Sequence, residues 1–204
     1  MDREELVRVR PVSPEDVPAL REIYSYYVEQ TTVSFEFASP SVEEFRRRVD
    51  LASSACPYLV YCERDRILGF AYARPAFERP AYAWLAETSV YVDRSARGRG
   101  IGKSLYGGLI SLLASQGYKA LYAIVTAENK ESCIFHQRNG FKTAAVFSNA
   151  GFKFGRWLDV VWYERVVGNY DALPRPPRAF VDLSPETVAT TLREINLDIG
   201  SRER

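Results

Sequence analysis

The sequence contains few of the residues on which metal and disulfide chemistry depend. Its 204 residues include one histidine, His136, and three cysteines, Cys56, Cys62 and Cys133. No two cysteines have the spacing of a zinc site, so we expect no metal. An odd number of thiols with no pairing pattern is typical of free cysteines in a reducing compartment, and it favours a cytoplasmic location.

Long apolar runs and an excess of one charge are also missing. Apolar stretches such as ALYAIV have the length of a strand, well below the ~20 residues of a membrane-spanning helix. The N-terminal MDREELVRVR is charged and has no apolar region of a secretory signal. The formal net charge of +1 gives no strong field. We therefore expect neither a nucleic-acid nor a membrane partner.

An alternation of strand and helix patterns is present over residues 1–168. Apolar alternation and buried apolar runs predict strands at 6–12, 58–65, 67–76, 86–93 and 119–125, followed by two strands around Gly151 and Gly155. Helical spacing predicts helices after Ser13, from Ser41, over 103–118 and over 129–138. The resulting order, β-α-α-β-β-β-α-β-α-β-β, predicts one mixed α/β domain.

Short signals refine the predicted helices. Ser41 and Glu44 form a capping-box pattern, and Asn139-Gly140 is typical of a helix end. Gly107 and Gly108 are poor helix formers in the middle of a predicted helix. We therefore expect another segment to pack closely against them.

Residues 169–204 differ in composition from the preceding domain. The stretch PRPPR (174–178) is expected to be extended. A helix is predicted over 184–200, with Ser184 as its N-cap and Pro185 in its first turn. We treat the segment as a C-terminal extension, which either covers a partner subunit or caps the sheet.

A loop rich in glycine and arginine, ARGRGIGKSL (96–105), lies between a predicted strand and a predicted helix. Gly102-Lys103-Ser104 matches the second half of an ATP-binding P-loop, but that loop needs a glycine where Arg97 stands. A dinucleotide loop needs its third glycine at Lys103 or Leu105, so it fails in both registers. Arg/Gln-x-x-Gly-x-Gly/Ala does fit. Its backbone N–H groups and helix N-terminus suit a pyrophosphate.

This loop resembles the acyl-CoA pyrophosphate loop of the GNAT superfamily of N-acetyltransferases. NKESCIFHQRNGF (129–141) is similar to the family segment that packs against the pantetheine arm, and AETSVYV (86–92) to the strand before the loop. More narrowly, ERPAYAWLAETSVYVDRSARGRGIGKSLYGGLI and GFKFGRWLDVVWY resemble the phosphinothricin and methionine sulfoximine N-acetyltransferase branch. The resemblance covers about residues 7–166.

The resemblance implies a fold, a cosubstrate and a reaction. The α/β fold would be the GNAT fold, a mixed, mostly antiparallel central sheet flanked by helices and splayed between its fourth and fifth strands. Acetyl-CoA would give its acetyl group, by direct attack, to the primary amine of a small amino-acid-like substrate. Two alternatives stay open: acetylation of a peptide or protein amine, and an acyl-CoA-binding module without catalysis. A homodimer is expected, as in much of this branch.

The resemblance also implies roles for individual residues. Glu87 would act as general base. His136, seven residues after Asn129, would protonate the leaving thiolate or help to relay the proton of the amine. The cofactor would bind Val90, Tyr91, Val92, Arg97, Gly98, Arg99, Gly100, Ile101, Gly102, Lys103, Asn129 and Ser132. The substrate, whose carboxylate calls for cationic and aromatic partners, would contact Phe35, Arg79, Tyr82 and Lys153, with Arg156 as a further candidate.

Overall fold

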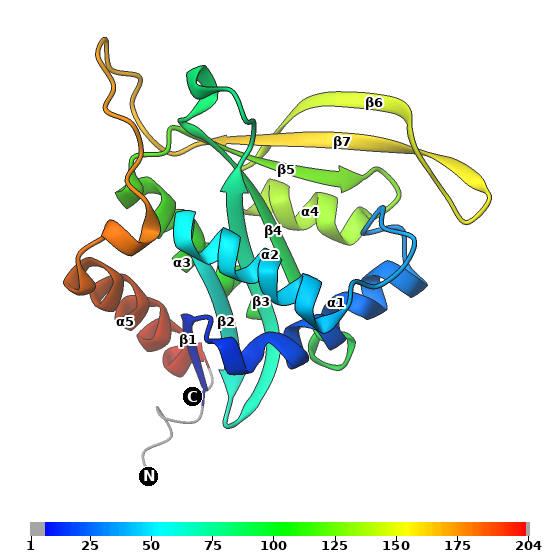
Figure 1. Cartoon of the computed structure of the whole chain (residues 1–204), viewed down its shortest axis with the longest axis horizontal. Helices are drawn as coiled ribbons and strands as arrows, with labels where there is room; N and C mark the ends of the chain where they lie inside the picture. The colour runs from blue at the N-terminus through cyan, green and yellow to red at the C-terminus, as the bar shows by residue number, and fades with distance from the viewer. Residues whose placement is uncertain (1–6, 203–204) are drawn as a thin grey trace.

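The computed structural model describes residues 7–202 and has the predicted order of elements (Figure 1). The strands are β1 (Val7–Pro11), β2 (Tyr58–Glu63), β3 (Arg66–Pro75), β4 (Leu85–Val92), β5 (Ala120–Thr126), β6 (Lys142–Lys153) and β7 (Arg156–Val166). The helices are α1 (Val17–Gln30), α2 (Val42–Ala55), α3 (Ile101–Gln116), α4 (Lys130–Arg138) and α5 (Pro185–Arg202). Short 3-10 turns join several of them, including η3 (Pro80–Tyr82) and η5 (Phe180–Asp182).

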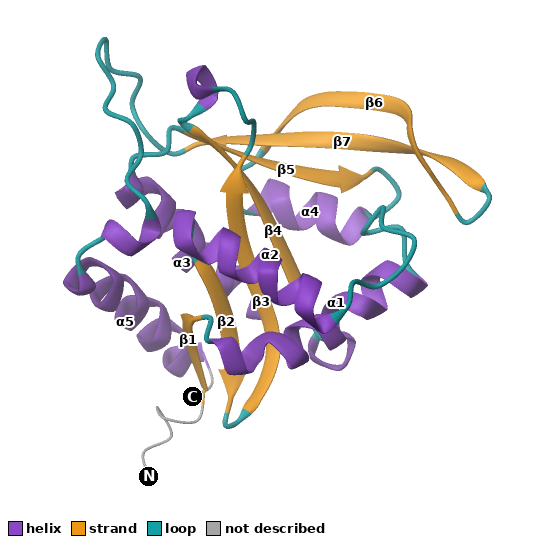
Figure 2. Cartoon of the chain, in the orientation of Figure 1, coloured by secondary structure: helices purple, strands orange, loops and turns teal. Residues whose placement is uncertain are grey.

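The strands form one seven-stranded sheet in the order β1-β2-β3-β4-β5-β7-β6. All neighbours are antiparallel except β4 and β5. The β4–β5 ladder ends at the pair Glu87 and Tyr122, although β4 continues to Val92 and β5 to Thr126. Figure 2 shows the consequence, with β5, β6 and β7 running crosswise to β2, β3 and β4. The predicted splay between the fourth and fifth strands is therefore confirmed.

Helices cover both faces of the β2–β4 part of the sheet. On one face, α1 and α2 bury an aromatic cluster with β3 and β4 that includes Tyr24, Phe45, Phe70 and Tyr91. The apolar side of α3 covers the other face. Along this side of the helix, every third or fourth residue is buried. Residues of β4 alternate between these faces, as strand geometry requires. Neighbouring β4 side chains can therefore serve two different sites.

The segment beyond residue 168 packs against the rest of the domain. Helix α5 lies on α3 and beside β1, and Leu192 and Ile199 are buried in the same cluster as α3. A Cβ at Gly107 would lie 3.1 Å from the side chain of Ile195. The expectation that a segment packs closely on the mid-helix glycines is confirmed, and the segment is α5. Among residues 7–202, none of the helices combines the length and apolar character needed to cross a bilayer.

The β6–β7 hairpin is bent by a bulge and closed by a tight turn. The ladder shifts register between Phe147 and Gly151, where Asn149 adopts a φ of 51° and its N–H donates to the carboxylate of Asp159 at 2.8 Å. Phe154 and Gly155, with φ of 50° and 75°, form the turn. Because bulges bend a strand pair, the end of the hairpin reaches the loop between α1 and α2.

Candidate active site

A cleft of about 1000 Å³ opens beside the diverging strands. Helix α2 and the α1–α2 loop form one wall, and β3 and β4 form the floor. Its charged residues are three acids and three bases: Glu36, Glu44, Glu87, Arg47, Arg48 and Arg74. Its aromatic residues are Tyr24, Phe35, Phe45, Tyr58, Phe70, Tyr72 and Tyr91. The cleft therefore suits a small ligand that carries both charges and an apolar part.

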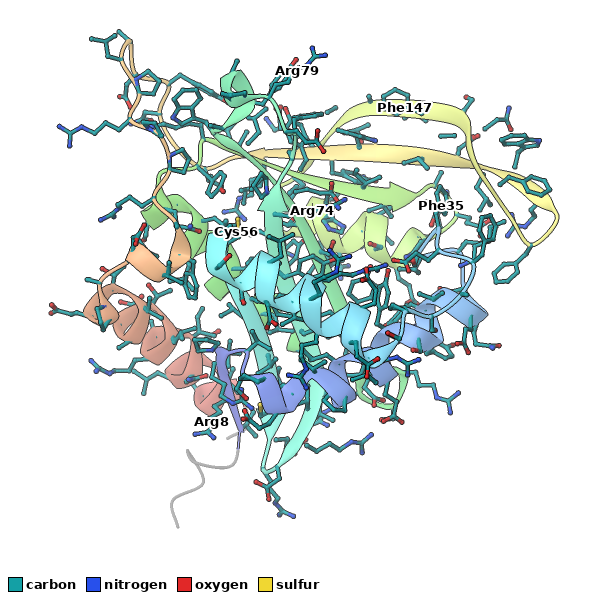
Figure 3. All side chains as sticks on the ribbon, in the orientation of Figure 1. Arg8, Phe35, Cys56, Arg74, Arg79 and Phe147 are labelled. Atoms are coloured by element: carbon teal, nitrogen blue, oxygen red, sulfur yellow. The ribbon has the colours of Figure 1, made fainter. Side chains whose placement is uncertain are left out.

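Glu87 and Arg74 form an ion pair across β3 and β4. They are direct register partners, and Nη2 of Arg74 lies 2.9 Å and 3.0 Å from the two carboxylate oxygens of Glu87. The Glu87 side chain is 16% exposed and that of Arg74 is 61% exposed. Burial acts to lower the pKa of Arg74, but the charge and hydrogen bonds of Glu87 outweigh it and raise that pKa. Two opposite charges thus stand side by side in the cleft, where Figure 3 labels Arg74.

Arg74 is a cleft residue that the sequence analysis missed. Its partnership with Glu87 follows from the antiparallel register of β3 and β4. The long connection through η3 hides that register in the sequence, because no tight turn fixes it. The strand patterns at 67–76 and 86–93, which follow one another in the chain, were the available signal that these two strands pair.

The aromatic floor of the cleft is a stack of rings from β2, β3 and β4. Tyr58 and Tyr72 lie 4.9 Å apart and nearly parallel, and Phe70 and Tyr91 lie 5.1 Å apart. Burial raises the pKa of Tyr58 and of Tyr72. These hydroxyls therefore stay protonated at neutral pH, so the floor is apolar and uncharged.

The loop between α1 and α2 brings Phe35 and Glu36 to the cleft. Glu36 accepts hydrogen bonds from Tyr24 Oη at 2.8 Å and from Arg48 at 2.6 Å. Phe35 is predicted to contact the substrate, and it does line the cleft. Its ring lies against the backbone of Gly151 in β6, where no Cβ would fit.

Lys153 is not placed in the cleft by the structure. Its side chain is 2% exposed, and its ammonium donates to the carbonyls of Val28, Thr31 and Ser34 at 2.6, 2.8 and 2.6 Å. Three hydrogens with three acceptors leave none for a substrate carboxylate. Burial lowers the pKa of Lys153. The structure thus reassigns this residue from substrate contact to holding the α1–α2 loop.

Arg79, Tyr82 and Arg156 also lie outside the cleft lining. Arg79 and Tyr82 are exposed on the η3 loop, where Tyr82 packs on Phe77 at a ring distance of 4.8 Å. Figure 3 places Arg79 on this projecting loop, apart from Arg74 and Phe35. Arg156 pairs with Glu128 at 2.8 Å. Their contact with a substrate stays a prediction.

The glycine loop has the backbone conformation that its residues predict. Gly98 and Gly100 have φ of 77° and 80°, and Gly100 is the N-cap of α3. The N–H groups of the first turn of α3 have no partners within the helix. A Cβ at Gly102 would lie 3.2 Å from the ring of Phe135. The loop and the N-terminus of α3 therefore form an electropositive cradle of backbone N–H groups that fits a pyrophosphate.

Basic side chains surround this cradle. The guanidinium of Arg97 lies 5.3 Å from the ring centre of Tyr27, and Arg99 donates to Glu63 at 2.9 Å. Lys103 is exposed in the first turn of α3. Arg97, Arg99 and Lys103 thus place positive charge around the cradle, as an anionic ligand requires.

The edge of β4 leads from this cradle to the cleft. Past Glu87, the β5 side of Val90, Tyr91 and Val92 lies outside the β4–β5 ladder. An extended ligand could therefore pair with this backbone as an added strand. Asn129 follows β5 and caps α4: its side-chain oxygen accepts a hydrogen bond from the N–H of Ser132 at 3.2 Å.

His136 lies on the opposite face of the sheet from Glu87. It is 4% exposed and contacts Ser132 of its own helix and Tyr106 of α3. Burial lowers its pKa and outweighs the raising effect of the Ser132 carbonyl. The site therefore does not bring its two predicted catalytic side chains into contact.

No group of three metal-ligating side chains occurs among residues 7–202.

Comparisons with known proteins agree with this geometry. The sequence profile described as acetyltransferase (GNAT) domain matches residues 9–162. A phosphinothricin N-acetyltransferase of Streptomyces coelicolor is 38% identical over 163 residues, 78% of this chain and 95% of that protein. An L-methionine sulfoximine/L-methionine sulfone acetyltransferase of Pseudomonas aeruginosa is 28% identical over 158 residues, 76% of this chain and 92% of that protein.

A solved structure is similar over most of the chain. It is a GNAT superfamily phosphinothricin acetyltransferase from Sinorhizobium meliloti in complex with AcCoA. Its TM-score is 0.78 at 30% identity, covering 89% of this chain and 97% of that one. The splayed sheet, the glycine cradle and the profile match lead to one conclusion: this chain belongs to the GNAT superfamily of acetyl-CoA-dependent N-acetyltransferases.

Proposed function

We propose that this chain acetylates the α-amine of a small amino acid of the phosphinothricin or methionine sulfoximine type. The observation that carries the proposal is the Arg74–Glu87 ion pair in an aromatic cleft beside the splayed strands. Relatives named for these two substrates align with 78% and 76% of this chain. An aromatic cleft that holds an arginine favours a small substrate over a peptide or protein amine.

The cofactor would lie between β4 and β5. The backbone of Val90, Tyr91 and Val92 would pair with its extended arm, and the loop from Arg97 to Lys103 would bind its pyrophosphate. Asn129 and Ser132 would flank the arm from α4. When bound, acetyl-CoA supplies the acetyl group as an activated thioester. The close contact between Gly102 and the ring of Phe135 supports this arrangement, because it leaves little space between the start of α3 and α4.

Glu87 would prepare the amine for attack. Its carboxylate lines the cleft on the strand whose edge would hold the cofactor. An ammonium cannot attack a carbonyl until it loses a proton, and Glu87 can accept that proton directly or through water. The neutral amine then forms the C–N bond as the C–S bond breaks.

Arg74 and Glu87 together would recognise the charged head of an amino acid. In the cleft, the two side chains pair with each other. A zwitterion offers the same two charges in reverse: its carboxylate suits the Arg74 guanidinium, and its ammonium suits Glu87. Phe35 and the ring stack would hold the side chain of the substrate, with Glu36 and Arg48 at the far wall.

The proposal is tested by an acetylation screen that measures CoA released from acetyl-CoA. The panel contains phosphinothricin, methionine sulfoximine, methionine sulfone, common amino acids and short peptides. Turnover with a small amino acid or analogue is expected. Turnover with peptides alone would favour the protein-amine alternative, and acetyl-CoA binding without turnover on any amine would favour a non-catalytic module.

Two substitutions test the roles of the ion pair. Glu87→Gln should cut kcat by ~10²–10⁴-fold, as loss of a general base does, with acetyl-CoA binding unchanged. Arg74→Gln should raise KM for an amino acid but not for its carboxamide, which lacks the carboxylate. The control is Glu22→Gln, an exposed acid of α1 outside the cleft. Near-normal turnover in Glu87→Gln would remove Glu87 from the mechanism.

We also propose that the chain forms a homodimer through the face of β5, β7 and β6 that α1 and α2 do not cover. This uncovered face is defined by Phe77, Tyr82, Phe147 and Trp162, whose rings contact one another. Soluble monomers rarely expose a joined apolar patch of this kind, and a second copy would bury it. Arg79 lies on the same η3 loop.

Sedimentation velocity tests the dimer. The chain is expected to sediment as a dimer, and Phe147→Glu should shift it to a monomer. Leu197→Glu, at an exposed position of α5, which packs on α3 and β1 instead, is the control. A wild-type monomer at all concentrations would contradict the proposal.

A cytoplasmic location is proposed as well. Cys56, Cys62 and Cys133 are free thiols in the structure, and burial raises the pKa of Cys56 to about 11. A reducing compartment keeps such thiols unpaired. Fractionation of the source cells should recover the chain with cytoplasmic markers, and recovery in an exported fraction would contradict the assignment.

A further inference from the structure

A buried chain of hydrogen bonds joins α4, α3 and β4. Nδ1 of His136 lies 2.7 Å from the carbonyl oxygen of Ser132, and Nε2 lies 2.9 Å from the hydroxyl of Tyr106. That hydroxyl lies 2.9 Å from Oγ1 of Thr88, which in turn lies 3.1 Å from the carbonyl oxygen of Tyr122. His136, Tyr106 and Thr88 are all buried.

The partners constrain the positions of the protons. A carbonyl oxygen only accepts, so Nδ1 of His136 carries the hydrogen that it donates to Ser132. The hydroxyl of Ser132, 3.3 Å from Nδ1, is near enough to share that hydrogen. In a neutral imidazole Nε2 is then an acceptor, and the Tyr106 hydroxyl donates to it. The Thr88 hydroxyl has a single hydrogen, which goes either to the Tyr106 oxygen or to the carbonyl of Tyr122.

The chain ends at the point where β4 and β5 separate. Glu87 and Tyr122 are the last ladder pair, and Thr88 is the next residue of β4. Its hydroxyl lies within hydrogen-bond distance of both the Tyr106 hydroxyl and the carbonyl of Tyr122, so Thr88 sits between α3 and β5 just beyond the ladder. Thr88 faces α3, whereas its neighbour Glu87 faces the cleft. Holding Thr88 therefore also holds the backbone that carries Glu87.

We propose that His136 is a positioning residue that acts through Tyr106 to fix Thr88 where β4 and β5 diverge, and that it does not protonate the leaving thiolate. The inference rests on the proposed acetyl transfer for its kinetic consequences. Alkyl thiols are weak acids, with a pKa of about 8.5 for cysteine, so a CoA thiolate can depart without a protein acid and take its proton from water. Glu87 returns the proton of the amine to solvent.

The first test observes the imidazole directly and needs no activity. His136 is the sole histidine, so ¹⁵N NMR of histidine-labelled protein gives one assignable imidazole. At pH 7 we expect the neutral ring with hydrogen on Nδ1. A charged ring at pH 7 would overturn the inference, because it would have a proton to give to the leaving thiolate.

The second test separates positioning from proton donation by kinetics. Tyr106→Phe and His136→Phe should lower kcat by a similar factor, up to ~10²-fold, and the double variant should be no worse. His136→Gln offers an amide oxygen as acceptor to Tyr106. It should recover most of the activity that His136→Phe loses, and its pH profile should keep the limbs of the wild-type profile. Tyr118→Phe, which removes a buried hydroxyl bonded to Cys56, is the control.

The opposite pattern would overturn the proposal. If His136 were the acid, His136→Gln would be as impaired as His136→Phe, and its pH profile would lose a limb. Tyr106→Phe would then remain active. Acetyl-CoA binding by calorimetry checks that each variant is folded. A wild-type chain inactive on every amine would refute the proposed function instead, and the NMR result would still decide the proton positions.

Discussion

The side-chain amide of Asn196 hydrogen-bonds both backbone groups of Val9. Its Oδ1 accepts from the N–H at 2.7 Å and its Nδ2 donates to the carbonyl at 3.1 Å. Val9 lies in β1, the outermost strand on that side of the sheet. Open strand edges invite pairing with other chains, so α5 covers an aggregation-prone edge by imitating a neighbouring strand.

Asn196→Ala should therefore destabilise the protein and promote self-association. Loss of the amide leaves two backbone groups of Val9 unpaired, which costs about 1–3 kcal/mol in the free energy of unfolding. Urea unfolding and light scattering measure the two effects. Glu194→Ala, an exposed change on the same helix, is the control and should leave both unchanged. Equal behaviour of the two variants would argue against an edge-covering role.

Lys153→Met should loosen the α1–α2 loop that carries Phe35. The three carbonyls that bind Lys153 would lose their donor, and each buried unpaired group costs about 1–3 kcal/mol. We expect a lower free energy of unfolding and a higher KM for the amine, with acetyl-CoA affinity unchanged. Lys142→Met, at the exposed start of the same hairpin, is the control. A raised KM without loss of stability would instead indicate that Lys153 contacts the substrate.

Gly100→Val should abolish acetyl-CoA binding. Gly100 has a φ of 80° at the N-cap of α3, and a branched side chain is strained in that conformation and would stand over the cradle. Isothermal titration calorimetry measures the loss. Gly155→Val is the matched control, because Gly155 has a φ of 75° in the distant hairpin turn. Normal binding by Gly100→Val would refute the cradle assignment.

Stability should fall as the pH drops below about 6.5, the ordinary pKa of histidine. Burial lowers the pKa of His136 in the folded state, so the unfolded chain binds a proton first. The loss is at most ~1.4 kcal/mol per pH unit and stops below the folded pKa. Tyr106 and Tyr163, whose rings contact His136, titrate far higher, since burial raises the pKa of Tyr163 to about 12 and that of Tyr106 further.

The measurement compares urea unfolding of wild type and His136→Gln from pH 7.5 to 5. Because the chain has one histidine, the difference in slope isolates its titration. We expect the wild-type curve to be steeper below pH 6.5. Parallel curves would show that His136 protonates equally in both states.

Local patterns were enough to predict the order of the elements and the cradle. Apolar periodicity depends on neighbours in the chain, so the strands and helices were visible without tertiary contacts. The positive φ angles of Gly98 and Gly100 are a property that glycine alone allows freely. The splay between the fourth and fifth strands was expected only through the family resemblance, and the β4–β5 ladder, whose last pair is Glu87 and Tyr122, bears it out.

The sequence by itself determined the fold class, the cosubstrate cradle and the strand that carries Glu87, because each depends on residue types at fixed spacings. The tertiary structure alone decided which groups meet across long separations. It paired Arg74 with Glu87, turned Lys153 into a loop anchor, and set Asn196 on the edge of β1. Such contacts follow from register and packing between distant elements, which no local spacing specifies.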